Sequence, residues 1–163
     1  KKVEGLGGSM RLGAQDVLLS EGSLAQFLYA GRLSVRERFR HRYEVDPAFI
    51  DRLTMGGLVF SGRHPTQPIM QVMELPAAPA GSGSPEAPVR THPYFIAGQF
   101  HPELTGRPLR PQPLFMGLIA AAIYRTYGQT DAGRADILGN PAIARWIKPV
   151  GRAAAPVSQS QRA

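Results

Sequence analysis

The residues best suited to chemistry in this chain are His101 and Glu103, at the end of the stretch formed by residues 94–103. The stretch begins as an apolar run, which indicates a buried strand. Gln99, His101 and Glu103 then follow where that strand should end. Side chains two positions apart in an extended chain point the same way, and Pro102 stiffens the turn by fixing its φ. We therefore expect the imidazole and the carboxylate to lie side by side.

A histidine held beside a carboxylate is the usual form of a general base. The carboxylate fixes the tautomer of the ring and stabilises the cation that forms when the ring takes a proton. Such a pair normally serves a nucleophile, and a thiol is the one we expect here. The sequence contains no cysteine, which excludes disulfides and thiolate metal sites within it. The nucleophile is therefore the part of the predicted site that these residues do not supply.

Arginine recurs at alternate positions in residues 34–45, which predicts a strand with one apolar and one basic face. The apolar side carries Leu33, Val35, Phe39, Tyr43 and Val45, with Glu37 and His41 interrupting it, and the other side carries Arg36, Arg38, Arg40, Arg42 and Glu44. Two interpretations stay open. The basic face is either solvated, or one or two of its guanidinium groups clamp a carboxylate or a phosphate.

Other patterns predict the elements that must position these residues. Strands are expected at residues 14–20, 58–62 and 69–75, and a helix at residues 24–29. A second helix begins at Asp46 and Pro47 and buries Phe49, Ile50 and Leu53. A third covers residues 114–127 and packs through Leu114, Leu118, Ala121 and Ala122. Residues 1–13 are expected to be loop, 76–91 a flexible insertion at a hairpin, and 129–163 a largely disordered C-terminal extension with one helical turn at 142–146.

Composition narrows the classes of function. The formal charge of +7 favours anionic partners. The aromatic residues among the arginines, Phe39 and Tyr43, fall on the opposite side of the strand and form no stacking pattern with them, so we expect no nucleic-acid binding. No apolar run approaches the ~20 residues that cross a bilayer, and no signal peptide is visible. The four histidines include no helical i,i+4 pair of the kind a zinc site uses, so we expect no metal site.

Six motifs, in order, carry a resemblance to a known family. They are GGSMRLG (7–13), RERFRHRYEVD (36–46), LVFSG (58–62), VMEL (72–75), HPYFIAGQFHPE (92–103) and RPLRPQPLFMGLI (107–119). Over about residues 5–124 they resemble the C-terminal class I glutamine amidotransferase domain of the CTP synthase family. A class I amidotransferase outside this family would share something like the HPE element. It would lack the arginine-rich strand followed by SG and the RPLRPQPLF ending.

The resemblance implies an α/β fold, the second half of an amidotransferase domain whose central sheet is mostly parallel with flanking helices. His101 and Glu103 match the family's Cys–His–Glu triad, and Arg42 matches the arginine that holds the α-carboxylate of glutamine. In that family the thiolate attacks the glutamine amide and releases ammonia. A separate synthetase domain, using ATP and Mg, then aminates UTP to CTP, and GTP activates glutamine hydrolysis. The resemblance implies no cofactor within these residues.

We therefore expect residues 1–128 to be the C-terminal part of such a domain, with the nucleophilic cysteine in a segment upstream of Lys1. The 163 residues would be inactive alone. The expected partners are glutamine and the remainder of a CTP synthase chain, assembled as a homotetramer in the cytoplasm. The alternative is a non-catalytic amidotransferase-like module that binds a ligand or partner without hydrolysing it.

Overall fold

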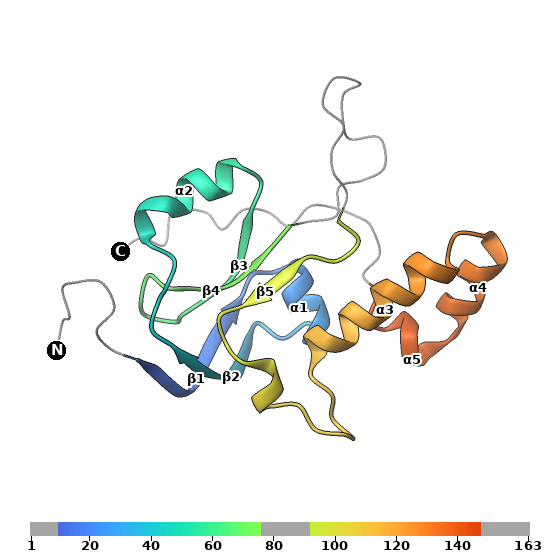
Figure 1. The fold of residues 1–163 in the computed structure, drawn as a ribbon, viewed down its shortest axis with the longest axis horizontal. Helices are drawn as coiled ribbons and strands as arrows, with labels where there is room; N and C mark the ends of the chain where they lie inside the picture. The colour runs from blue at the N-terminus through green and yellow to red at the C-terminus, as the bar shows by residue number, and fades with distance from the viewer. Residues whose placement is uncertain (1–9, 76–91, 148–163) are drawn as a thin grey trace.

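A single antiparallel sheet forms the centre of the protein, seen in a computed structural model that describes residues 10–75 and 92–147 (Figure 1). Its strand order is β2-β1-β3-β4-β5. The strands are β1 (Arg11–Leu19), β2 (Ser34–His41), β3 (Val59–Arg63), β4 (Met70–Glu74) and β5 (Ile96–Gly98). The helices are α1 (Leu24–Leu28), α2 (Pro47–Met55), α3 (Pro113–Tyr127), α4 (Asp131–Gly139) and α5 (Pro141–Ala144), and η1 (Pro102–Leu104) is a 3₁₀ turn.

The sheet curls so that the chain leaving β5 returns to β2, at the opposite end of the strand order. Phe100 forms an antiparallel bridge with Phe39 of β2. Their rings pack edge to face with centroids 6.0 Å apart, and both residues are buried. The backbone N–H of His101 donates to the carbonyl oxygen of Arg38 at 2.8 Å. The predicted basic strand and the predicted catalytic stretch are therefore direct neighbours.

The expectation of a mostly parallel sheet is wrong for the described residues, because every strand pair there is antiparallel. Parallel neighbours need a crossover of a dozen or more residues, whereas only residues 64–69 join β3 to β4. Buried and exposed residues also alternate along β2. That alternation is typical of an antiparallel sheet with one solvated face, while parallel strands are buried on both faces.

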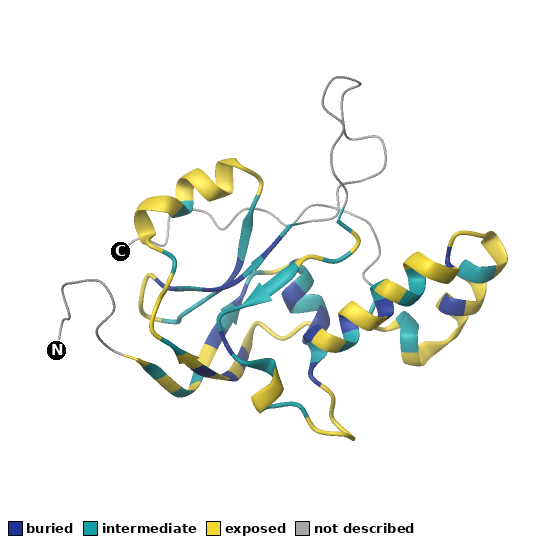
Figure 2. Ribbon diagram, in the orientation of Figure 1, coloured by how far each residue is buried: buried dark blue, intermediate teal, exposed yellow. Residues whose placement is uncertain are grey.

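The hydrophobic core lies between the sheet, α1 and the start of α3 (Figure 2). Helix α3 buries Leu114, Gly117 and Ala120, whereas Leu118 is 54% exposed. The expected packing side of this helix is therefore correct only at Leu114. A Cβ at position 117 would lie 2.6 Å from Cδ2 of Leu28. Helix α3 thus approaches α1 through its small residues, and its larger side chains are left outside.

Helix α2 begins and ends where the sequence predicts, but it does not bury its apolar side. The carboxylate of Asp46 accepts from the N–H of Ala48 at 2.9 Å, and the helix ends at Gly56. None of its residues is buried, and Phe49 is 50% exposed. The expected buried stripe is wrong because α2 stands beside the sheet instead of packing on it (Figure 1).

The expectation of disorder after residue 128 is wrong for residues 131–139, which form α4, whereas the helical turn expected at 142–146 is confirmed in part by α5 at Pro141–Ala144. Side-chain caps start both helices, since Thr130 accepts from the N–H of Gly133 and Asn140 from that of Ala142, each at 3.0 Å. Ile137 is buried, and α4 contacts α3. The composition of this segment offers few apolar side chains for a core. The two caps and the burial of Ile137 nevertheless support helices there.

Three predictions concern residues wholly or partly outside the described ranges, namely the loop expected at 1–13, of which 1–9 are not described, the insertion (76–91) and the end of the extension (148–163). The loop prediction is wrong for residues 11–13, because β1 already begins at Arg11. The predicted pairing of the two strands that flank the insertion is confirmed, because β4 and β5 form an antiparallel ladder. Within the described ranges, no helix is long and apolar enough to span a bilayer.

Candidate active site

The stretch that carries His101 and Glu103 begins with a strand shorter than expected. Strand β5 covers only Ile96–Gly98. Before it, the hydroxyl of Tyr94 donates to the carbonyl oxygen of Leu114 at 2.6 Å, which fastens the chain to α3. After Phe100 the chain enters η1, with His101 at its N-cap and Pro102 in its first turn. Phe100, just before this turn, is buried in the core. The side chains of His101 and Glu103, in the turn itself, are partly exposed to solvent.

His101 and Glu103 meet as the sequence predicts. Nδ1 of His101 lies 2.7 Å from Oε1 of Glu103, and the two side chains are 38% and 58% exposed. A carboxylate only accepts hydrogen bonds, so Nδ1 carries the proton and Nε2 is the nitrogen that can take another. The contact is made across a 3₁₀ turn, not along an extended chain. The pair has the geometry of an oriented general base that is open to solvent.

The hydrogen bond from His101 holds the pKa of Glu103 below its ordinary value of 4.5, and the backbone N–H of Glu103 adds to the effect. We expect the carboxyl of Glu103 to titrate below 4.5 in a carbon-13 NMR experiment. In His101→Ala its pKa should move back toward the ordinary value.

The sign of the pH effect on stability follows from this direction. Because the folded-state pKa is lowered, the contribution of Glu103 is present above its unfolded pKa and is lost as pH falls through the folded value. Unfolding of the protein and of Glu103→Gln should therefore differ in pH dependence only in the acidic range below about 4.5. A Glu103 pKa that is unchanged by His101→Ala would contradict the contact.

Arg38 lies opposite His101 across the bridge between β2 and the chain after β5. Phe39 and Phe100 form the bridged pair and point inward, so Arg38 and His101, one residue away on each side, share the outer face. By the same register Arg40 lies opposite Gln99. The alternating sequence pattern predicts that these arginines share one face of β2. It does not predict that the chain after β5 lies beside them.

Arg42 lies in the bend just after β2, because the strand ends at His41 and not at residue 45 as expected. It is exposed. The side-chain amide of Gln99 donates to the carbonyl oxygen of Tyr43 at 2.7 Å. This bond joins the bend that carries Arg42 to a residue two positions before His101. The structure thus brings the segments of all three predicted site residues to one edge of the sheet.

The arginines of the basic face differ in what they contact. Arg36 donates to the carboxylate of Asp16 at 2.9 Å and to the carbonyl oxygen of Ala14 at 3.2 Å. Its guanidinium is therefore satisfied within the fold. Arg38 and Arg40 are exposed, and their cross-strand neighbours on β1 are Ala14 and Leu12, which carry no charge. The basic groups available to an anion thus lie toward the end of β2 that neighbours His101.

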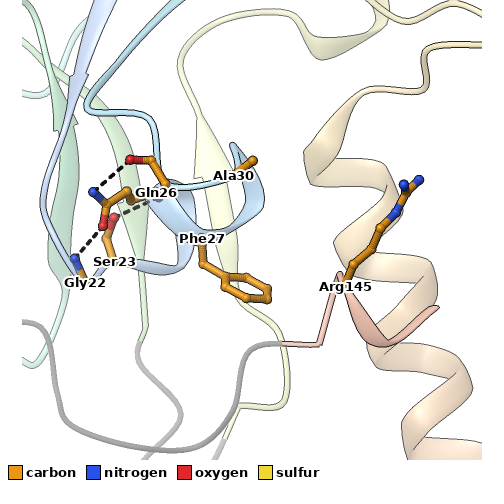
Figure 3. A pocket seen from close by; sticks show the side chains of 7 residues that line it. Gly22, Ser23, Gln26, Phe27, Ala30 and Arg145 are labelled. Carbon is orange, nitrogen blue, oxygen red and sulfur yellow. Dashed lines mark hydrogen bonds between the residues drawn. The ribbon is translucent and has the colours of Figure 1, made fainter. Parts of the chain in front are cut away.

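A pocket of about 460 Å³ lies elsewhere, between α1 and α5 (Figure 3). None of the predicted site residues lines it. Its lining consists of Gly22, Ser23, Gln26, Phe27, Ala30, Gly31 and Arg145. The guanidinium of Arg145 lies over the ring of Trp146, 4.9 Å from its centroid. Among the described residues, no group of three or more histidine, aspartate or glutamate side chains is arranged to hold a metal ion.

Comparisons with known proteins show which family the chain belongs to. Residues 1–121 match the family model described as glutamine amidotransferase class-I. The chain is similar to CTP synthase of Nocardioides sp. (strain ATCC BAA-499 / JS614), with 48% identity over 126 residues covering 76% of this chain and 20% of the relative. It is also similar to CTP synthase of Hyphomonas neptunium, with 45% identity over 118 residues covering 72% and 19%. The chain thus spans about a fifth of the length of these relatives.

A solved structure described as Trypanosoma brucei CTPS, glutaminase domain with bound acivicin, is also similar. The two share 30% identity with a TM-score of 0.59, over 74% of this chain and 42% of that chain. The likeness shows a shared fold over about three quarters of this chain.

Proposed function

The chain belongs to the class-I glutamine amidotransferase family, and from that premise we propose that it supplies the base of a glutamine-hydrolysing site in a CTP synthase. The observation that carries the proposal is the contact of 2.7 Å between His101 and Glu103. This contact lies beside a strand whose arginines are exposed. A general base next to guanidinium groups suits a substrate that has both an amide and a carboxylate.

In the proposed reaction, Nε2 of His101 takes the proton of a cysteine thiol while Glu103 stabilises the imidazolium. The thiolate attacks the side-chain amide carbon of glutamine. As the C–N bond breaks, His101 returns the proton to the leaving nitrogen, which departs as ammonia. Water, deprotonated by the same histidine, then cleaves the glutamyl thioester to glutamate and restores the thiol. Since these 163 residues contain no cysteine, the thiol in this proposal comes from another segment.

Arg42 is proposed to hold the α-carboxylate of glutamine. A planar guanidinium can donate two parallel hydrogen bonds to a carboxylate, which fixes the orientation of the substrate as well as its affinity. The support is the position of Arg42. The residue after it, Tyr43, accepts a hydrogen bond from the side chain of Gln99, which lies two positions before His101. A clamp there would hold one end of glutamine while the amide lies at the imidazole.

Because the similar proteins are described as CTP synthases, we extend the proposal from glutamine hydrolysis to CTP synthesis. The ammonia released here would pass to a synthetase domain in the remainder of the chain, where ATP and Mg serve the amination of UTP to CTP. GTP would act as an activator of glutamine hydrolysis. The homotetramer and the cytoplasmic location stay predictions.

The test is glutamine hydrolysis by the intact protein, with every segment that naturally accompanies these residues. Glutamine labelled with nitrogen-15 at the amide should yield labelled ammonia and glutamate in equal amounts, and alkylation of thiols should stop the release. A folded protein that binds glutamine but releases no ammonia would overturn the proposal in favour of a non-catalytic binding module.

A further inference from the structure

A carboxylate lies inside the protein, on the inner face of β2. Glu37 is only 5% exposed, between Val35 and Phe39 on the side of the strand that faces the core. It accepts hydrogen bonds from the hydroxyl of Tyr29 at 2.6 Å, from the hydroxyl of Thr105 at 2.9 Å and from the amide of Gln112 at 3.0 Å. This buried group takes no part in the proposed reaction.

The protons of this network can be assigned from its distances. The amide nitrogen of Gln112 donates to the hydroxyl of Tyr29 at 2.6 Å as well as to Glu37, so Tyr29 must direct its own proton to the carboxylate. Thr105 has one proton and two acceptors, and Glu37 is closer than the carbonyl oxygen of Pro102, at 2.9 against 3.2 Å. Glu37 therefore accepts hydrogen bonds from three neutral donors.

A buried carboxylate of this kind is expected to lower the stability of the fold rather than raise it. Removing a charge from water without an opposite charge is unfavourable, and apolar side chains of similar volume often serve a core as well or better. Burial and the bond to Glu37 also raise the pKa of Tyr29 far above its ordinary value. The arrangement calls for a reason other than stability, and the partners of Glu37 indicate what that reason is.

Two adjacent residues of β2 hold the two ends of the segment that carries the general base. The carbonyl oxygen of Arg38 holds the backbone N–H of His101 at one end. The carboxylate of Glu37 holds Thr105, the residue directly after η1, at the other. Residues 101–105 are thus fixed to one strand at both ends, and Glu103 lies between the two attachments. Neither attachment uses an atom of the His101–Glu103 contact itself.

We propose that Glu37 is a positioning residue, which acts through Thr105 to set the 3₁₀ turn so that Glu103 stays in contact with His101. The inference rests on the proposed function of that pair. Without the bond to Thr105, the turn can shift while His101 stays attached to Arg38. Glu103 then no longer holds the proton on Nδ1, and the ring populates the tautomer in which Nε2 carries the proton and cannot act as a base.

Thr105→Val tests this most cleanly, because it removes the hydroxyl and keeps the shape of the side chain. In the intact protein, kcat for glutamine hydrolysis should fall about 10- to 100-fold, because small misplacements of catalytic groups have effects of this size. KM for glutamine should change by less than about twofold, since a uniform loss of binding would appear in KM instead. Thr105→Ser, which restores the hydroxyl, should recover most of the rate.

Tyr29→Phe is the matched control, because it removes a hydrogen bond to the same carboxylate without touching the turn. It should lower the unfolding temperature and leave kcat within about twofold of the unaltered protein. The direct readout is NMR of the His101 ring nitrogens and of the Glu103 carboxyl. In Thr105→Val, but not in Tyr29→Phe, the Nδ1–H tautomer should lose population and the Glu103 pKa should rise.

Two results would overturn the inference. One is a Thr105→Val protein with an unchanged tautomer and an unchanged Glu103 pKa. The other is an equal loss of kcat in Thr105→Val and Tyr29→Phe, which would show that the network only stabilises the core. The NMR readout needs no turnover, so failure of the proposed function, seen as no glutamine hydrolysis by the unaltered protein, is distinguishable from failure of this inference.

Discussion

Replacing His101 by alanine is expected to lower glutamine hydrolysis about 10²- to 10⁴-fold in kcat, the range that a positioned general base contributes. The side chain that would deprotonate the thiol and protonate the leaving nitrogen is then absent. If the proposed reaction is right, ammonia-dependent CTP formation by the intact protein should continue, because added ammonia would bypass the proposed glutaminase step. The two activities are measured side by side on one preparation, with glutamine or an ammonium salt as the nitrogen source.

His64→Gln is the matched control for this experiment. His64 lies between β3 and β4, where its Nδ1 accepts from the backbone N–H groups of Thr66 and Gln67 at 3.2 Å each. A glutamine there keeps an acceptor for the turn, and both activities should persist. Loss of both activities in His101→Ala would contradict a specific role, since it would show that His101 supports the fold and not only the hydrolysis.

Replacing Arg42 by alanine is expected to raise KM for glutamine roughly 10- to 150-fold with little change in kcat. Removing a charge-assisted contact to a carboxylate costs about 1.5–3 kcal/mol, and each 1.4 kcal/mol is about tenfold in affinity. The effect should fall on KM because the proposed clamp would hold the α-carboxylate of glutamine equally well in the ground state and the transition state. Initial rates over a range of glutamine concentrations separate the two constants.

Arg36→Ala is the matched control on the same strand. Its guanidinium is already bound to Asp16 at 2.9 Å, so its removal should leave KM for glutamine within about twofold. An Arg42→Ala protein with normal glutamine affinity would refute the clamp. Equal increases in KM for Arg36→Ala and Arg42→Ala would instead indicate a general effect of positive charge near the site.

Sequence patterns predict the features of this protein that depend on neighbours along the chain. The two-residue spacing of His101 and Glu103, the alternation in β2 and the cap of α2 at Asp46 all involve residues a few positions apart. Each is present in the structure. The patterns fail where burial depends on a distant partner. Helix α2 has an apolar side that the described residues do not bury. Helix α3 buries Gly117 and Ala120, and Leu28 and Tyr94 approach it at Gly117.

The surroundings of the candidate site illustrate the same limit. The alternating pattern marks Glu37 as an interruption of an apolar face, which is a visible signal of something unusual. Two of its three partners, however, lie 68 positions away at Thr105 and 75 away at Gln112. The neighbourhood of Arg38 and His101 likewise depends on the curl of the sheet. Register between distant strands is set by tertiary packing, which local periodicity does not encode.

The most direct test of the central claim is the distance between a cysteine thiol and the ring of His101 in a structure of the intact protein. The claim predicts a cysteine sulfur within ~4 Å of Nε2, allowing for the loose contacts of a site without substrate. A structure in which no thiol from any segment comes near that nitrogen, or in which other chain covers the His101–Glu103 corner, would contradict it.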